Sequence, residues 1–263
     1  MEMSLNGRTA LVCGASSGIG MACAAELAAL GASCVLLSRS AERLHAAMGD
    51  LPTTAGQRHH AIAADLGKPD AARDAVKAWL GANSATIHIL VNNTGGPAAG
   101  SAIDADAGAI LAAVNAQLVA AHLLAQLLTP GMKTARFGRI INITSTSVKQ
   151  PIPGLGVSNI VRPAVAAWAK CLSAELGAFG ITVNNVLPGY TRTERLSSLF
   201  QGRAAKQGTS LDAIEAEVAA SIPAGRMGEP HEIAAAVAFL ASPAASYISG
   251  VNLPVDGGRL GCL

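Results

Sequence analysis

The feature that most constrains this chain is the stretch from Thr9 to Gly20, where a short apolar run leads into a cluster of glycines. The run is typical of a buried strand, and Gly14, Gly18 and Gly20 follow with the spacing G-x-x-x-G-x-G. Gly14 permits a tight turn, Gly18 lets the backbone approach a ligand, and Gly20 lets a new helix pack closely on the strand. Because the first turn of a helix has unpaired N–H groups and the positive end of the helix dipole, this turn is suited to a bound pyrophosphate. An ordinary strand-to-helix turn can carry the same glycines, so the rest of the chain decides between the two interpretations.

The alternation of strand and helix continues through the chain. Further buried strands are predicted at 33–38, 61–64, 87–92, 138–144, 182–186 and 251–255, and helices at 19–30, 69–80, 104–128, within 154–179 and at 229–240. The composition agrees, since 51% of the 263 residues are hydrophobic but only 3% are aromatic, as expected for a core of Ala, Val, Leu and Ile in a sheet buried on both faces. The chain therefore predicts an α/β fold, a single-domain Rossmann-type doubly wound parallel sheet with helices on both faces, over residues 1–263.

The segment from Thr191 to Ser221 differs from the rest because it is polar, has a helical pattern and follows a predicted strand. It ends just before Pro223. Segments of this kind commonly cover the ligand-binding edge of a parallel sheet. We therefore expect residues 191–221 to form a mobile lid over the strand ends.

The net charge bears on which partners the chain can bind, and the cysteines and histidines bear on disulfides and metal sites. The net charge of +2 comes with no cluster of Lys or Arg, so neither a nucleic acid nor a membrane surface is expected as a partner. The cysteines are odd in number and form no C-x-x-C pair, and the histidines lack metal-ligand spacing, so we expect reduced core thiols and no metal site. The cysteines are Cys13, Cys23, Cys34, Cys171 and Cys262.

The N-terminal segment before Thr9 is too short and polar for a signal peptide, which favours a cytoplasmic protein.

The residues at the end of the second predicted strand, Ser38 and Arg39, bear on the choice of nicotinamide cofactor. In dinucleotide-binding folds an acid about 20 positions after the glycines binds the ribose 2′-hydroxyl, whereas a basic residue accommodates a 2′-phosphate. No acid stands here, and Arg39 can pair with the phosphate and stack on the adenine. We therefore predict NADP(H) rather than NAD(H). The alternative is that Arg39 is a solvated residue beside a helix cap at Ser40.

Several further motifs lie at the ends of predicted strands or on the helices between them. In chain order they are Asp65-Leu66, Asn92-Asn93-Thr94-Gly95, Asn115, Ser145, Asn184-Asn185-Val186-Leu187-Pro188-Gly189 and Val255-Asp256-Gly257-Gly258. Together with the glycine turn, these motifs resemble the short-chain dehydrogenase/reductase family over nearly the whole chain. Within that family the chain is most similar to the group of 3-oxoacyl-acyl-carrier-protein reductases.

The resemblance implies a set of cofactor contacts. Gly14, Ser16, Ser17, Gly18, Ile19 and Gly20 would hold the pyrophosphate, Asp65 and Leu66 the adenine, Asn92 and Gly95 the adenosine-side ribose region, and Pro188, Gly189, Thr191 and Thr193 the nicotinamide half. The resemblance also implies a small-molecule carbonyl or alcohol as substrate. Members of the family are usually homotetramers or homodimers, joined through two long helices and through the C-terminal strand region.

One departure from the family pattern affects the expected chemistry. The family has Tyr-x-x-x-Lys beginning thirteen positions after the serine at the end of the fifth strand, and in this chain these positions, counted from Ser145, hold Ser158 and Arg162. A phenol can protonate a substrate oxygen when a neighbouring cation lowers its pKa, but an aliphatic alcohol is a far poorer acid. Arg162 keeps the positive charge and can hold the nicotinamide ribose, but it stays protonated and cannot relay a proton.

Two functions remain open from the sequence. The first is an NADP(H)-dependent oxidoreductase whose altered site still positions the substrate and stabilises developing charge. Its catalytic residues would be Ser145, Ser158, Arg162 and Asn115. Asn115 lies in an apolar stretch, where a buried structural amide is the alternative role. The chain has only two tyrosines, of which Tyr190 either donates a proton or lines the pocket, and Tyr247 is expected to be structural. The other function is a dinucleotide-binding protein that has lost redox activity and serves as a sensor or as a partner subunit in an oligomer.

Overall fold

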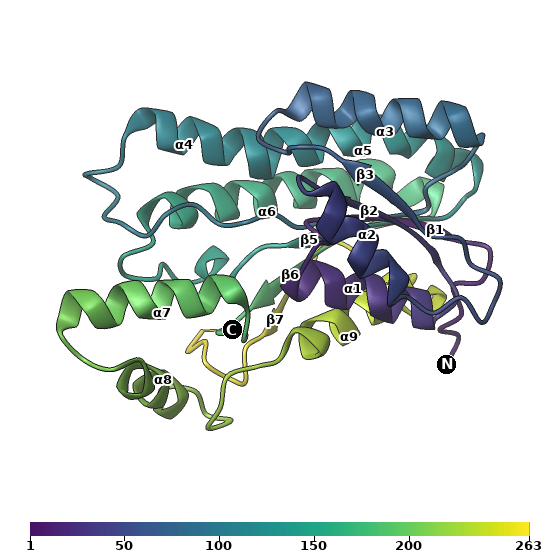
Figure 1. Ribbon diagram of the computed structural model, residues 1–263. Coiled ribbons are helices and arrows are strands. Elements are labelled where there is room, and N and C mark those ends of the chain that lie inside the picture. Colours follow the sequence, from purple (N-terminus) through teal and green to yellow (C-terminus); the bar gives the residue numbers. More distant parts are fainter. Residues whose placement is uncertain (263) are drawn as a thin grey trace.

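One parallel sheet organises the chain (Figure 1). The computed structural model describes residues 1–262, in which seven strands pair in the order β3-β2-β1-β4-β5-β6-β7. The strands are β1 (Thr9–Cys13), β2 (Ser33–Ser38), β3 (His60–Ala63), β4 (Ile89–Asn92), β5 (Gly138–Ile143), β6 (Ile181–Pro188) and β7 (Asn252–Val255). Every pair is parallel, which confirms the doubly wound α/β fold. The strand order reverses between β1 and β4, where open sheets of this kind bind ligands.

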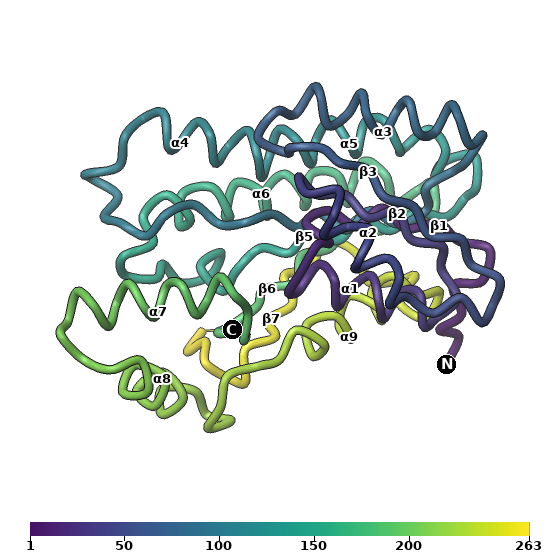
Figure 2. The backbone as a smooth tube through the Cα atoms, viewed as in Figure 1, coloured from purple at the N-terminus to yellow at the C-terminus, as the bar shows by residue number. Residues whose placement is uncertain are grey.

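Helices cover both faces of this sheet. They are α1 (Gly18–Ala29), α2 (Ala41–Gly49), α3 (Pro69–Asn83), α4 (Ala107–Val114), α5 (Ala120–Thr134), α6 (Gly156–Leu176), α7 (Glu194–Gln207), α8 (Leu211–Ala220) and α9 (Pro230–Ala241). In Figures 1 and 2, α1, α2 and α9 lie on one face, and α3, α5 and α6 lie on the other. α7 and α8 lie apart from both layers, at the lower left of the two views.

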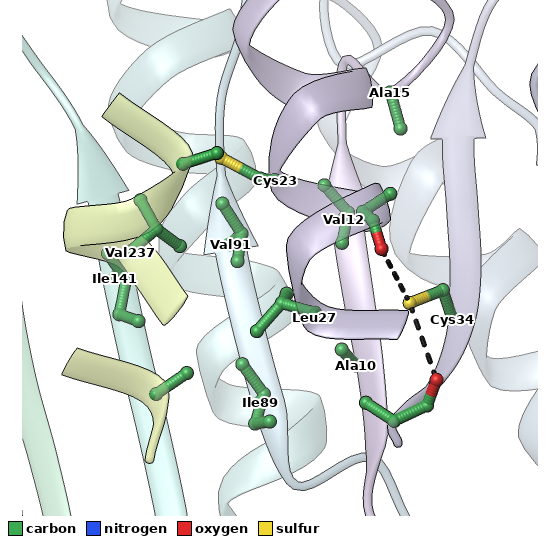
Figure 3. Close-up of a cluster of buried hydrophobic side chains, with 14 of the residues drawn as sticks. Ala10, Val12, Ala15, Cys23, Leu27, Cys34, Ile89, Val91, Ile141 and Val237 are labelled. Carbon is green, nitrogen blue, oxygen red and sulfur yellow. Dashed lines mark hydrogen bonds between the residues drawn. The ribbon is translucent and has the colours of Figure 1, made fainter. Parts of the chain in front are cut away.

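The alternation of side chains along the strands explains the two layers. In β1, Val12 belongs to the core under α1 and α9, whereas Leu11 belongs to the core under α3, α5 and α6. Both side chains are fully buried. Figure 3 shows the first of these cores, to which Leu27 of α1 and Val237 of α9 contribute. Small and aliphatic side chains fill most of both cores, as the composition predicts, because each strand is buried on two sides.

The helical stretch from α4 to α5 differs from the prediction. It begins at Ala107 rather than at 104, continues to Thr134 rather than ending at 128, and contains a π-helical turn at Asn115–Val119. Asp106 determines its start, because the carboxylate accepts a hydrogen bond (3.3 Å) from a backbone N–H of the first turn. The stretch is long and apolar enough to cross a membrane by length and composition alone, a test that core helices of soluble proteins also pass. Its C-terminal half packs on the sheet through residues such as Leu128.

The cysteines divide into two groups. Cys13, Cys23 and Cys34 are buried as expected, and burial raises the pKa of each thiol to about 12. Cys171 and Cys262 are exposed, so the expectation that the thiols lie in the core is wrong for these two. No group of three or more His, Cys, Asp or Glu side chains within residues 1–262 is arranged to hold a metal ion.

A row of asparagines crosses the sheet from the carboxyl end of β4 to the first residue of β7. Asn92 of β4 donates a side-chain hydrogen bond to Asn142 of β5 (2.8 Å). Asn142 donates in turn to Asn185 of β6 (2.9 Å), and Asn185 donates to Asn252 of β7 (2.8 Å). Each pair lies at the same register of neighbouring strands. Because the first three side chains are buried, these bonds offset a large desolvation penalty and favour this one register.

Replacing Asn142 with leucine should lower the free energy of unfolding by about 2–4 kcal/mol, because the buried amides of Asn92 and Asn185 would each lose a partner. Urea denaturation followed by circular dichroism measures the change. Asn252→Ala at the partly exposed end of the row is the control, and it should cost only about 1 kcal/mol. Equal losses for the two variants would contradict the role assigned to the row.

Candidate functional site

The glycine turn between β1 and α1 contacts the loop that follows β4. Gly14 and Gly18 have φ angles of +60° and +57°, which residues with a side chain rarely adopt. A Cβ on Gly14 would lie 2.6 Å from Nδ2 of Asn93, and a Cβ on Gly20 would overlap the carbonyl oxygen of Gly14. Nδ2 of Asn93 donates to the carbonyl oxygens of Cys13 and Gly14 (3.3 Å each). The glycines therefore let α1 start directly at the end of β1, in contact with the end of β4.

The end of β2 lies next to this turn, because β2 pairs with β1. The hydroxyl of Ser38 is buried and has no hydrogen-bond partner within residues 1–262. Arg39 is exposed, and Ser40 caps α2 by accepting a hydrogen bond (3.2 Å) from the N–H of Arg43. The cap expected at Ser40 is therefore present. An unpaired buried hydroxyl beside an exposed guanidinium offers a phosphate two hydrogen-bond donors.

The other predicted cofactor residues follow the carboxyl ends of β1, β3, β4 and β6, so parallel pairing brings them to one edge of the sheet. They are Ser16, Ser17 and Ile19 (partly exposed), Asp65 and Gly95 (exposed), Leu66, Pro188, Gly189 and Thr193 (partly exposed), and Asn92 and Thr191 (buried). Asp65 shapes the turn after β3, since its carboxylate accepts a hydrogen bond (2.9 Å) from the N–H of Gly67. The side chains of Asn92 and Thr191 face the protein interior.

The start of α7 closes over the same edge. Thr193 caps α7 by accepting a hydrogen bond (3.2 Å) from a backbone N–H, and its Cγ2 would lie 3.3 Å from a Cβ on Gly18. Glu194 pairs with Arg43 of α2 (3.1 Å). Arg195 donates to the loop after β4. Three consecutive residues thus connect the predicted lid to three parts of the edge.

The helices α7 and α8 share a small core of their own. Its buried members are Phe200, Ala204, Ile214, Val218, Ile222 and Met227. Tyr190 packs against this core, with its ring 5.8 Å from that of Phe200 and the guanidinium of Arg259 4.6 Å from its centre. This packing favours the lining role for Tyr190 over that of a proton donor. Tyr247 is fully exposed and joins no core of residues 1–262, so its structural role stays a prediction.

Ser158 and Arg162 lie one turn apart on α6 and face the end of β5. Nε of Arg162 donates to the hydroxyl oxygen of Ser158 (3.1 Å), and Nη1 donates to the carbonyl oxygens of Ile143 (3.2 Å) and Thr144. Because Ser158 accepts this bond, its own O–H can donate to another acceptor. Ser145, at the end of β5, likewise accepts a bond (3.1 Å) from a nearby backbone N–H and keeps its O–H free.

The charge of Arg162 is permanent. Burial, and to a lesser degree the neighbouring charge of Arg195, lower the pKa of Arg162 to about 10, so the guanidinium remains protonated at neutral pH. Among the described residues no Asp or Glu pairs with it. Main-chain carbonyl oxygens stabilise the charge instead. Since Nε and Nη1 already donate to protein acceptors, the binding of the nicotinamide ribose by Arg162 stays a prediction.

Asn115 is not a buried amide, so the structural alternative for this residue is wrong, whereas its catalytic role stays a prediction. It is exposed and begins the π-helical turn, where its carbonyl oxygen accepts a bond from the N–H of Ala120. The buried amide is Gln117, which lines a small cavity together with Asn142 and Arg162. A π-helical turn inserts an extra residue and rotates the helix beyond it, so helical periodicity alone assigns the wrong amide. Gln117 is a second polar residue in the same apolar run, and this feature of the sequence could have identified it as the buried amide.

A family model, relatives in sequence and solved structures all match this chain over most of its length. The family model described as Enoyl-(Acyl carrier protein) reductase matches residues 14–259. A 3-oxoacyl-[acyl-carrier-protein] reductase, FabG of Vibrio harveyi, is 32% identical over 97% of this chain and 98% of its own length. L-Sorbose reductase from Gluconobacter frateurii, in complex with NADPH and L-sorbose, superposes with a TM-score of 0.93 at 31% identity and full coverage of both chains.

A short-chain type dehydrogenase/reductase from Mycobacterium marinum gives a TM-score of 0.86 at 28% identity, covering 99% of this chain and 98% of its own. These matches extend from the glycine turn past β7, so they include the strand ends, the lid and α6 as well as the dinucleotide motif. The chain belongs to the short-chain dehydrogenase/reductase family.

Proposed function

We propose that this chain is an NADP(H)-dependent oxidoreductase that reduces a carbonyl to an alcohol or catalyses the reverse reaction. The observation that carries the proposal is the arrangement of Ser145 and Ser158, two hydroxyls free to donate, beside the permanent charge of Arg162. The chain's relatives include a 3-oxoacyl reductase and a sugar reductase in complex with NADPH. A 3-oxoacyl compound is therefore one candidate substrate.

The residues present fit a phosphorylated dinucleotide. The glycine turn places the first N–H groups of α1, which have no partner within the helix, where a pyrophosphate can accept from them, and the unpaired hydroxyl of Ser38 suits a 2′-phosphate together with Arg39. The nicotinamide half would lie toward Thr193, which faces the turn from the lid. When bound, NADPH supplies the hydride for the carbonyl carbon.

The protein's own groups act on the carbonyl oxygen. Ser145 and Ser158 donate hydrogen bonds to it, and Arg162 strengthens Ser158 as a donor because a cation bonded to the hydroxyl oxygen polarises its O–H. These bonds become stronger as negative charge develops on the oxygen. Neither hydroxyl is an effective acid, so water supplies the proton, and the loss of a positioned acid slows the reaction by about 10²- to 10⁴-fold.

A second function has one observation in its favour. The cation of Arg162 is tied to main-chain carbonyls, and no phenol stands beside it, so a dinucleotide-binding sensor or partner subunit without redox activity also fits these residues. NADPH absorbance measured with ketones, β-ketoacyl compounds and quinones separates the two. Oxidation of NADPH with any of them supports the enzyme. Binding of NADPH without turnover, restored by Ser158→Tyr combined with Arg162→Lys, supports the second function.

We also propose that the protein is a cytoplasmic homotetramer or homodimer and that residues 191–221 act as its lid. Leu111 of α4 and Ile160 of α6 are 63% and 45% exposed on two helices that pack together, and such apolar side chains favour burial against another copy. Analytical ultracentrifugation of the wild type measures the assembly, and a monomer at all concentrations would contradict it.

Replacing Ser158 with alanine should lower kcat for the best carbonyl substrate by about 10²-fold, because one donor to the developing oxyanion is lost. The affinity for NADPH, measured by calorimetry, should stay unchanged. Ser173→Ala, near the other end of α6, is the matched control. An unchanged kcat in the Ser158 variant would remove this hydroxyl from the mechanism.

Replacing Arg39 with aspartate should reverse the cofactor preference. The wild type should bind NADPH more tightly than NADH by about 10- to 100-fold, the range of a charged hydrogen bond, and the carboxylate should repel the 2′-phosphate. Titration calorimetry with both cofactors measures the ratio. Arg58→Asp makes the same charge change on the loop before β3 and should leave the ratio as it is. Tighter binding of NADH by the wild type contradicts the assignment.

A further inference from the structure

Arg195 is the one arginine among residues 191–232 that has no carboxylate partner. Within residues 191–232, Arg192, Arg203 and Arg226 each pair with a glutamate, at 3.3, 2.6 and 2.6 Å. Arg195 pairs with none, and its Nη2 donates to the carbonyl oxygen of Pro97. A neutral carbonyl is a weaker partner for a guanidinium than a carboxylate is.

The side chain of Arg195 crosses the carboxyl edge of the sheet, from α7 to the loop after β4. The guanidinium lies close against Gly96, since a Cβ there would be 3.1 Å from Nη2 and 3.2 Å from Nε. The charge of Arg195 also acts on Arg162, which bonds to Ser158. Arg195 therefore lies on the side of the site where the carbonyl of the proposed reaction would bind.

No acidic side chain balances these two cations. Residues 93–100 include no Asp or Glu, and none of the ion pairs within residues 1–262 involves Arg162 or Arg195. Arg195 is exposed at the surface of the lid, and the partial desolvation of its guanidinium lowers its pKa, as the deeper burial of Arg162 does for that residue. An anion bound beside them would offset this desolvation cost.

We propose that the substrate carries a carboxylate one or two bonds from its carbonyl carbon, as in a 2-oxo or a 3-oxo acid, and that Arg195 binds this carboxylate. The inference rests on the proposed reductase function and adds the substrate class, an oxo acid or the corresponding hydroxy acid. The planar guanidinium presents paired N–H groups that match the two oxygens of a carboxylate. On binding, the carboxylate takes the place of the carbonyl oxygen of Pro97 as the acceptor of the Nη2 bond.

Matched pairs of substrates test this proposal, namely pyruvate with methyl pyruvate and acetoacetate with methyl acetoacetate. Each ester keeps the carbonyl and removes the charge. In the wild type, kcat/KM should be higher for the acids than for the esters. Arg195→Gln should lower kcat/KM for the acids by about 10- to 100-fold with little change for the esters, and Arg195→Lys should retain part of the preference. Arg203→Gln, on the same helix, should leave the acid-to-ester ratio unchanged.

A binding measurement separates this proposal from the reductase function. Acetoacetate is titrated by calorimetry into the wild type and into Arg195→Gln, each with and without NADPH. Binding of acetoacetate that depends on Arg195 supports the carboxylate site. If such binding occurs but NADPH is not oxidised, the result contradicts the reductase function and leaves the carboxylate site in place. Equal kcat/KM for acids and esters, or equal loss of both in Arg195→Gln, overturns the carboxylate site and leaves the reductase in place. No binding of acetoacetate to the wild type overturns it as well.

Discussion

The parallel direction of the strands is the constraint on which the rest of the structure depends. It brings the carboxyl ends of β1 to β6 to one edge, and the candidate site lies between this edge, α6 and the start of α7. Two sets of amides hold the strands and the glycine turn in register. The row from Asn92 to Asn252 connects four strands, and Asn93 fastens the end of β4 to the glycine turn. Buried amides of this kind favour one alignment, because any slip would leave them unpaired.

Arg162 gives the site its electrostatic character. A guanidinium usually shares its charge with a carboxylate when it is buried, but here carbonyl oxygens at the end of β5 and the hydroxyl of Ser158 are its only partners among the described residues. The charge is therefore not neutralised. It remains available to polarise Ser158 and to attract an anion, and Arg195 extends the same positive region across the edge from the lid.

Much of the fold follows from local patterns, because buried strands and amphipathic helices are encoded by neighbouring residues. The glycine turn, the alternation of strands and helices, and the placing of Ser158 and Arg162 on the helix after the fifth strand all follow from residue type and spacing in this way. The predictions failed where the helix was not regular. The π-helical turn at Asn115 rotates the following residues, so Gln117 rather than Asn115 enters the cavity, and no periodicity within the run indicates that insertion.

The sequence by itself determined the class of fold, the position of the dinucleotide turn and the loss of the phenol and lysine on α6, since each depends on residue type and spacing along the chain. Only the tertiary structure decided which groups meet. Arg162 turns toward the end of β5, four asparagines from four strands form one row, and Arg195 reaches a loop 98 residues away. The physical reason is that hydrogen bonds between distant segments depend on how the strands and helices pack. The pattern of residues within one segment does not encode this packing.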